Sequence, residues 1–438
     1  MRPRKITLLP LVAATYFIVA GGPFGLEDIV AKSGYGGALL ILLLTPLLWS
    51  FPTALMVSEL ASALPEEGGY YVWVSRAMGP FWGFQEAWLS LVGSFFDMAI
   101  YPTLFVAYLG RLAPELTAGI RGIVIAVALV AVCAAWNLAG ARTVGVSSVW
   151  MGGLLLSPFL VLTVAALLHR VQAGASAPPL GRSDILGGIL VAMWNYMGWD
   201  NASTIAGEVE RPERTYPLAM LCSTLLVAAT YAIPVAAAAA SGLGLNVWSS
   251  GGWPDVARGI IPGGPGAALA FAVAIAAMLG AAGTMNTLTM AYSRLPAALG
   301  AGGYLPRRFA RLTPRSGAPW VSILACAAVW ALCLGLSFVK LVVLDVLLTG
   351  LSILLEFIAL VALRVREAGL HRPYRVPGGL FGAVAIGVPP LALLVLTALR
   401  SNIEPVGPID ALELGGLSIG LGIVLYFVAC WRRNRSIE

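Results

Sequence analysis

The stretch that decides the fold is Gly-Gly-Pro-Phe-Gly-Leu-Glu-Asp at residues 21–28, which interrupts a long apolar run near the start of the chain. Glycine weakens a helix, and Pro23 removes a backbone donor while crowding the preceding turn. A second interruption, Trp-Asn-Tyr-Met-Gly-Trp-Asp-Asn at residues 194–201, places polar and aromatic residues inside a later apolar run. A kinked structural helix would explain one such break, but two breaks indicate irregular backbone that lines a cavity.

The apolar runs around these breaks are long enough to cross a membrane. Of 438 residues, 59% are hydrophobic and only 11% are charged, and the mean hydropathy is +0.87. A soluble domain carries about 25% charged residues, so a soluble globular enzyme and a disordered chain are both excluded. About 20 apolar residues span a bilayer. On that basis we predict twelve spans, at 6–31, 37–62, 81–110, 119–139, 143–169, 185–207, 216–242, 264–293, 319–338, 341–364, 381–399 and 413–431.

The distribution of basic residues predicts the orientation. With twelve spans both termini lie on one side, and loops on that side hold 19 of the 27 Lys and Arg residues, against 8 on the other side. Basic residues gather in cytoplasmic loops. We therefore expect a multi-pass protein of the cytoplasmic membrane with both termini in the cytoplasm. The net charge of +6 is explained by this topology and requires no nucleic-acid partner.

Acidic residues fall within the predicted spans, whereas basic residues cluster at the ends of the spans. The acids are Glu27, Asp28, Glu59, Glu86, Asp97, Asp200 and Glu356. An ionised carboxylate inside a bilayer is costly and indicates function by default. Glu59 and Glu86 lie near the ends of their spans, so we expect structural roles for them. An acidic interior without basic partners is complementary to a cation, either a proton or an amine.

Other functional classes fit the sequence less well. The chain has only two histidines, His169 and His371, and no HExxH pattern, so we expect neither an intramembrane enzyme nor a metal site. No GxxxxGK[ST] loop is present, so ATP is not expected as the direct energy source, and no cofactor is expected. A channel or a non-transporting receptor that binds amines remains as a remoter alternative, because polar cavities serve these classes too.

Six motifs, in order, resemble the amino acid–polyamine–organocation superfamily, and most closely its plant-type polyamine uptake branch. They are the first break, PEEGGYYVWV at 65–74 with GPFWGFQ at 79–85, WD at 199–200 with GEVERP at 207–212, SR at 293–294, GYLP at 303–306, and RPYRVPG at 372–378. The resemblance covers residues 10–380. It implies an all-α membrane protein with a five-plus-five inverted repeat whose first and sixth helices are broken. The implied units are a first repeat at 1–171, a second repeat at 184–366, and two further helices with a cytoplasmic tail at 381–438.

The resemblance also implies roles for individual residues. Ala20, Gly21 and Gly22 match the segment whose amides hold an amino acid's carboxylate in relatives. Trp194 matches an aromatic that closes over the substrate, and Asp200 matches an acid tied to proton sensing. The expected substrate-binding residues are Ala20, Gly21, Gly22, Glu27, Asp28, Asp97, Tyr101, Trp194, Tyr196, Trp199 and Asp200, and Asp200 and Glu356 are the expected proton-coupling residues.

Two departures from the family pattern bear on the substrate. Pro23 lacks an N–H, and two acids follow it, so an anionic group is disfavoured at the first break. Some proton-coupled relatives carry a lysine on helix five where this chain has Leu155, Leu156 and Ser157, so a coupled proton must bind a carboxylate. Both departures predict a proton-driven carrier of cationic amines such as putrescine or spermidine, working by alternating access. Asp97 would bind one end of a diamine, and Glu27 or Asp28 the other.

Several alternatives stay open at this point. An amino acid permease, or an amino acid/amine exchanger of the same superfamily, is the main one. Uptake and exchange are not distinguished by the sequence, and neither is the coupling ion. The expected partners are a small-molecule amine or amino acid, protons and the lipid bilayer, and a homodimer is an open question.

Overall fold

The computed structural model describes residues 5–173, 184–335, 338–401, 405–406 and 409–435. Almost all of the described chain is helical. The elements are α1 (Leu8–Val19), α2 (Glu27–Thr45), the π-helical η1 (Pro46–Ser50), α3 (Phe51–Ala63), α4 (Tyr70–Met78), α5 (Pro80–Leu112), α6 (Pro114–Thr117), α7 (Ile120–Asn137), α8 (Ala141–Ala173), α9 (Ile185–Asn195), the 3₁₀-helical η2 (Asp200–Glu208), α10 (Pro212–Ala240), η3 (Leu245–Val247), α11 (Trp253–Ile260), α12 (Gly263–Tyr292), α13 (Arg294–Ala301), η4 (Arg307–Ala310), α14 (Trp320–Leu332), α15 (Phe338–Arg366), α16 (Gly379–Ala385), α17 (Val388–Ser401) and α18 (Ala411–Arg435). Two-residue strands β1 (Pro405–Val406) and β2 (Ile409–Asp410) pair antiparallel before α18.

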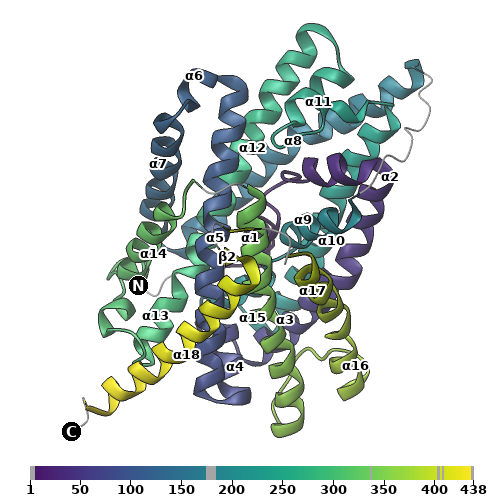
Figure 1. Ribbon diagram of the computed structural model, residues 1–438. Coiled ribbons are helices and arrows are strands. Elements are labelled where there is room, and N and C mark those ends of the chain that lie inside the picture. The colour runs from purple at the N-terminus through teal and green to yellow at the C-terminus, as the bar shows by residue number, and fades with distance from the viewer. Residues whose placement is uncertain (1–4, 174–183, 336–337, 402–404, 407–408, 436–438) are drawn as a thin grey trace.

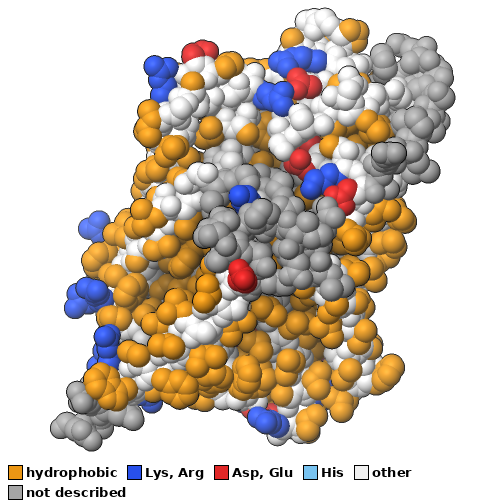
Figure 2. Space-filling view, viewed as in Figure 1, with side chains coloured by type: hydrophobic (Ala, Val, Ile, Leu, Met, Phe, Trp, Pro, Cys, Tyr) orange, Lys and Arg blue, Asp and Glu red, His pale blue; other side chains and the backbone are white. Residues whose placement is uncertain are grey.

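The helices form an elongated bundle with a membrane-compatible surface (Figure 1). Within the described residues, nine helical segments are long and apolar enough to cross a membrane, and two shorter apolar helices, α1 and α14, accompany them. Figure 2 shows hydrophobic side chains over most of the visible face, with Lys and Arg mainly near its upper end and margins. The protein is therefore a multi-pass membrane protein, as its composition predicts.

The first predicted break is present and lies between α1 and α2. Residues 20–26 are non-helical, and Gly21, Gly22 and Gly25 have φ of +59°, +107° and +83°, values that favour glycine. The boundary expected at 32–36 falls at Gly34 (φ 64°, ψ 174°), where the chain kinks between two helical segments of α2. The connection is a single non-helical residue rather than a longer loop.

The second predicted break separates α9 from η2. Helix α9 ends at Asn195, and the chain resumes at Asp200 as a 3₁₀ helix rather than an α-helix. The two breaks are in contact. A Cβ added to Gly25 would lie 2.7 Å from the Trp194 ring, and one added to Gly198 would lie 3.1 Å from the Ile18 carbonyl oxygen. Glycine at these positions lets the two irregular segments approach closely.

Three long helices surround these breaks. Helix α5 packs along both α15 and α12, and in Figure 1 α5 and α15 lie near the middle of the bundle. The loop predicted at Val339 and Lys340 is wrong, since both residues belong to the first turn of α15. The residues that follow in α15 include one acid, Asp345, which lies within the predicted span 341–364 and which the sequence analysis overlooked.

Candidate functional site

A narrow cavity lies between the two breaks and the central helices. Its lining comes from the end of α1, from α5, α12 and α15, and from the segment that runs from α9 into η2. It encloses about 260 Å³ of empty space, of which about 10 Å³ can hold the centre of a water molecule. That is room for about one water. The described lining contains two aspartates and no Lys or Arg, so the cavity is anionic in character.

Asp97 of α5 is the best-connected acid of this cavity. Its Oδ1 accepts hydrogen bonds from the Tyr101 hydroxyl at 2.7 Å and from Nε1 of Trp194 at 3.3 Å. Its Oδ2 accepts from the Tyr292 hydroxyl at 3.2 Å. Three donors from α5, α9 and α12 therefore converge on one carboxylate. Its side chain is almost completely buried.

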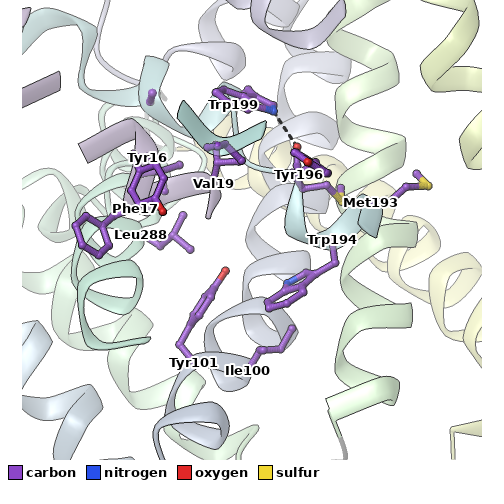
Figure 3. Close-up of a cluster of buried hydrophobic side chains, with 14 of the residues drawn as sticks. Tyr16, Phe17, Val19, Ile100, Tyr101, Met193, Trp194, Tyr196, Trp199 and Leu288 are labelled. Atoms are coloured by element: carbon purple, nitrogen blue, oxygen red, sulfur yellow. Dashed lines mark hydrogen bonds between the residues drawn. The ribbon is translucent and has the colours of Figure 1, made fainter. Parts of the chain in front are cut away.

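The aromatic partners of Asp97 form one side of the cavity. The rings of Tyr101 and Trp194 lie 6.2 Å apart between centroids and are tilted by 31°, and Figure 3 shows them next to each other below Val19. Tyr292 also receives a hydrogen bond from Nδ2 of Asn201 at 3.3 Å, which connects η2 to the same group. Aromatic faces attract cations when they are desolvated, so rings and carboxylate suit the same kind of ligand.

Asp345 is a site residue that the sequence analysis missed. It lines the same cavity from α15 and is 2% exposed, and its Oδ1 accepts a hydrogen bond from the Thr349 hydroxyl at 2.8 Å. The sequence does contain an indication of its importance, because Asp345 is an acid within the apolar run that follows Lys340. With Asp97, it gives the cavity two carboxylates from two different helices.

A second group of acids lies close to this cavity. Glu86 of α5 accepts from the hydroxyls of Ser90 at 3.0 Å and Ser352 at 2.9 Å through one oxygen. Both oxygens of Glu356, the other oxygen of Glu86 and Oδ1 of Asp200 are buried without a hydrogen-bond partner among the described residues. Asp200 is near enough to Glu86, Glu356 and Asp97 to interact with each electrostatically.

The two acids after the first break point in different directions. Glu27 is fully buried, and one of its oxygens accepts a hydrogen bond from the Tyr108 hydroxyl. Asp28 is partly exposed and accepts from the Ser250 hydroxyl at 2.8 Å, near the end of the bundle where α11 lies. Neither residue belongs to the lining of the cavity that holds Asp97.

Other predicted site residues are placed around the cavity rather than in it. The amides of Ala20 and Gly21 both donate to the Tyr16 carbonyl oxygen, at 2.7 and 3.3 Å. The Tyr196 hydroxyl donates to the Leu42 carbonyl at 2.8 Å, and Trp199 donates to the Tyr196 carbonyl at 2.8 Å (Figure 3). A Cβ on Gly22 would meet Phe24 and Leu155. Of the predicted residues, Asp97, Tyr101 and Trp194 are brought together in the lining, and Asp200 lies beside it.

The expectation that the buried acids lack basic partners is wrong for Glu59. Arg364 donates to both of its oxygens, Arg372 lies 3.3 Å from Oε1, and the Val376 amide donates to Oε2 at 2.7 Å. Glu59 and Arg372 are almost completely buried. Glu59 thus joins α3 to the end of α15 and the segment that follows it, which agrees with the structural role expected of it.

Contacts close the bundle on both sides of the cavity. Where α11 lies, Nε1 of Trp253 donates to the Pro23 carbonyl at 2.5 Å, and Arg111 binds Asp255 at 2.7 Å. Near α4 and α13, Ile6 forms a parallel bridge with Val209, and Arg294 pairs with Glu208 at 2.5 Å. The cavity is thus separated from both ends of the molecule by ordered contacts.

Two membrane helices that are interrupted around a small, acidic and closed cavity are the arrangement of a membrane transporter. Comparison of the sequence with known families agrees, because the profile described as amino acid permease matches residues 12–406. The chain belongs to the amino acid permease family and is a transporter.

The similar proteins include several from plants. Polyamine transporter PUT1 from Oryza sativa subsp. japonica is 35% identical over 419 residues, covering 95% of this chain and 77% of that protein. A probable polyamine transporter from Arabidopsis thaliana is 37% identical over 434 residues, covering 96% and 86%. Polyamine transporter RMV1 from Arabidopsis thaliana is 32% identical over 421 residues, covering 95% and 84%. The resemblance to the polyamine branch is thus confirmed at the level of sequence.

Proposed function

We propose that the protein is a secondary active transporter that moves cationic amines of the polyamine class across the cytoplasmic membrane. The observation that carries this proposal is the cavity that holds Asp97 and Asp345 without a lining Lys or Arg. A diamine has two positive charges and no carboxylate, so two acids on different helices match its chemistry. The names of the plant relatives point to the same substrate class.

The first break supports an amine over an amino acid. An amino acid's carboxylate needs free amide donors, and Pro23 has none. The amides of Ala20 and Gly21 already donate to the Tyr16 carbonyl. The amino acid permease or exchanger remains the second candidate, because the family carries that description.

We therefore revise the two-pole proposal. Asp97 would remain one pole, and Asp345 would take the place that was expected of Glu27 or Asp28. Trp194 and Tyr101, which donate directly to Asp97, would cover the bound amine, and Asn201 and Tyr292 would link η2 to Asp97. Glu27, Asp28, Tyr196, Trp199 and the Ala20–Gly22 segment would support the breaks or the route toward the cavity.

We assign proton coupling to Asp200, together with Glu86 and Glu356. Three buried carboxylates that lie close together cannot all be ionised at low cost, since like charges repel and desolvation is expensive. Glu356, whose two oxygens lack partners among the described residues, would therefore carry a proton in this closed state. Asp200 interacts electrostatically with Glu86 and Glu356 and also with Asp97, so charge on the substrate site and protons on the acids would influence each other.

The transport cycle would be alternating access around the cavity. Joining α1 to the first turns of α2, and α9 to η2, gives twelve spans, with repeats at 1–171 and 184–366 and two further helices at 381–438. The closing contacts at both ends, and the room for about one water, support a closed intermediate of that cycle. The excess of Lys and Arg in the loops predicted to share a side with both termini, 19 against 8, supports a cytoplasmic location for the termini.

The test is a substrate panel on the purified protein in proteoliposomes. Radiolabelled putrescine uptake would be competed with spermidine, a monoamine of similar length, arginine and leucine, each at the same concentration. We expect spermidine to compete best. If leucine or arginine competes better than any polyamine, the second candidate is correct. Amine binding without accumulation would instead indicate a receptor, and flux that does not saturate would indicate a channel.

A further inference from the structure

A basic pocket lies far from the transport cavity, between the segment after α13 and the last turns of α18. Its described lining holds Arg307, Arg432 and Arg433 and no acidic residue, and it encloses about 1020 Å³ of space, counting the part open to solvent. In Figure 1 α13 and the C-terminal half of α18 lie side by side at the lower left. The two walls come from parts of the chain more than 100 residues apart, so the fold itself builds this pocket.

Aromatic packing holds the two walls together. Tyr304, which lines the pocket, stacks on Tyr426 of α18 with ring centroids 5.7 Å apart and an interplanar angle of 26°. Phe84 of α5 packs against both rings, at 5.5 and 5.6 Å. Arg433 also interacts electrostatically with Tyr304, which places its guanidinium on the wall of the pocket. The arginines are thus held near one another by a rigid contact rather than scattered over a loop.

Three guanidinium groups line this pocket, and its described lining contains no carboxylate. A cleft lined by charges of one sign attracts ions of the opposite sign, so the pocket suits an anion. Arginine binds phosphate through several parallel N–H donors, which makes phosphate the best-matched anion. Free phosphate compounds and lipid headgroups share this chemistry, so the surroundings of the pocket decide between them.

The surroundings favour a lipid. On α18, within two turns of the pocket arginines, Phe427 and Trp431 are 61% and 54% exposed, and Trp82 at the start of α5 is 45% exposed. Exposed tryptophan beside arginine is typical of the boundary between hydrocarbon and headgroups. Basic pockets between membrane helices bind anionic headgroups. We propose that this pocket binds the phosphate of an anionic membrane lipid, whose acyl chains lie along the apolar face of α18.

The experiment measures lipid binding to the purified full-length protein by native mass spectrometry, with phosphatidylglycerol and phosphatidylcholine as probes. The test variant is R432Q/R433Q. The matched control is R311Q/R315Q, which removes two exposed arginines outside the pocket lining. Each arginine near an anionic lipid is worth about fivefold in affinity. We expect R432Q/R433Q to weaken phosphatidylglycerol binding by about 25-fold, the control by less than twofold, and R432K/R433K to retain most of the affinity.

Three results would overturn the proposal. Equal losses in R432Q/R433Q and in the control would indicate general surface charge, and equal binding of phosphatidylcholine would exclude anion recognition. Displacement of the lipid by glycerol 3-phosphate at the same phosphate concentration would indicate a soluble ligand instead. Should R432Q/R433Q fail to fold, R307Q alters the opposite wall and is expected to weaken binding about fivefold; unchanged binding in R307Q would also count against the site.

Discussion

The indole Nε1 of Trp194 donates to Oδ1 of Asp97 at 3.3 Å, and this bond joins the interrupted helix α9 to the long helix α5. The same oxygen accepts a hydrogen bond from the Tyr101 hydroxyl, so two aromatic side chains and one carboxylate form a connected group. A cation that bound Asp97 would compete with these donors for the carboxylate. In the proposed transport cycle, substrate binding would thus be coupled to the position of Trp194.

Replacing either cavity acid should weaken amine binding. D97N and D345N each keep the shape of the side chain but remove the charge and turn one acceptor oxygen into an NH₂ donor. Each should cost a diamine about 1.5–3 kcal/mol, or roughly 10- to 150-fold in apparent affinity. The measurement is putrescine inhibition of labelled uptake, with a monoamine measured in parallel. A monoamine should lose much less in one of the two variants. Equal losses for diamine and monoamine in both variants would refute the two-pole site.

Asp200 should control the pH dependence of transport. In D200N the group can no longer exchange a proton, so initial uptake should change little across pH 5.5–8, whereas wild-type uptake should vary. The control is E213Q, which alters an acid in the first turn of α10. An unaltered pH profile in D200N, in a protein that still binds putrescine, would remove Asp200 from the coupling mechanism.

Gly25 should be required for the close contact between the first break and the second break. G25A introduces a Cβ 2.7 Å from the Trp194 ring at a φ of +83°. The matched control is G79A, where φ is +97° but no atom lies within 4 Å of the added Cβ. Both variants strain the backbone, but only G25A also places a methyl group against Trp194. When uptake is normalised to the amount of folded protein, G25A should therefore be less active than G79A. Equal specific activity in the two variants would contradict the close approach.

Glu59 should matter for stability rather than transport. E59Q leaves the largely buried Arg364 and Arg372 without their carboxylate, and breaking such a pair costs about 3–5 kcal/mol. The measurement is thermal unfolding in detergent, with E66Q, an exposed acid on the same side, as the control. A melting temperature for E59Q equal to that of E66Q would show that the pair contributes nothing.

The ion pair between Arg76 and Glu367 gives a smaller, pH-dependent effect. Arg76 binds both carboxylate oxygens, at 2.9 and 2.7 Å, and holds the pKa of Glu367 below its ordinary value. A lowered acid pKa adds stability above the ordinary pKa, near 4.3, and this is lost as the pH falls through the lowered value. Because the pair is exposed, E367Q should cost about 0.2–1 kcal/mol at pH 7, and the cost should shrink as the pH falls below the ordinary pKa of Glu367. A cost that stays constant as the pH is lowered until the protein unfolds would exclude ionisation as its cause.

The sequence was sufficient for features that depend on local chemistry. Glycine and proline clusters located both breaks, and acids within apolar runs located Asp97, Asp200 and Glu356. The sequence failed where the outcome depended on which helices meet. Asp345 lies inside the predicted span 341–364, but nothing in the sequence indicated that α15 would bring it to the same cavity as Asp97 of α5.

Side-chain directions beyond the breaks could not be predicted either. Helical periodicity does not apply to residues 196–199, so nothing in the sequence indicated that the Tyr196 hydroxyl would bind the Leu42 carbonyl. The partners of Glu59 come from more than 300 residues away. Such long-range pairing is decided by tertiary packing, which the local pattern does not contain.

Putrescine accumulation in proteoliposomes with an inward proton gradient tests the central claim, a proton-driven amine carrier, most directly. We predict accumulation above the external concentration, collapse to equilibrium when a protonophore is added, and loss of accumulation in D97N. Accumulation that is unchanged by the protonophore, or no putrescine transport by a folded wild-type protein, would contradict the account.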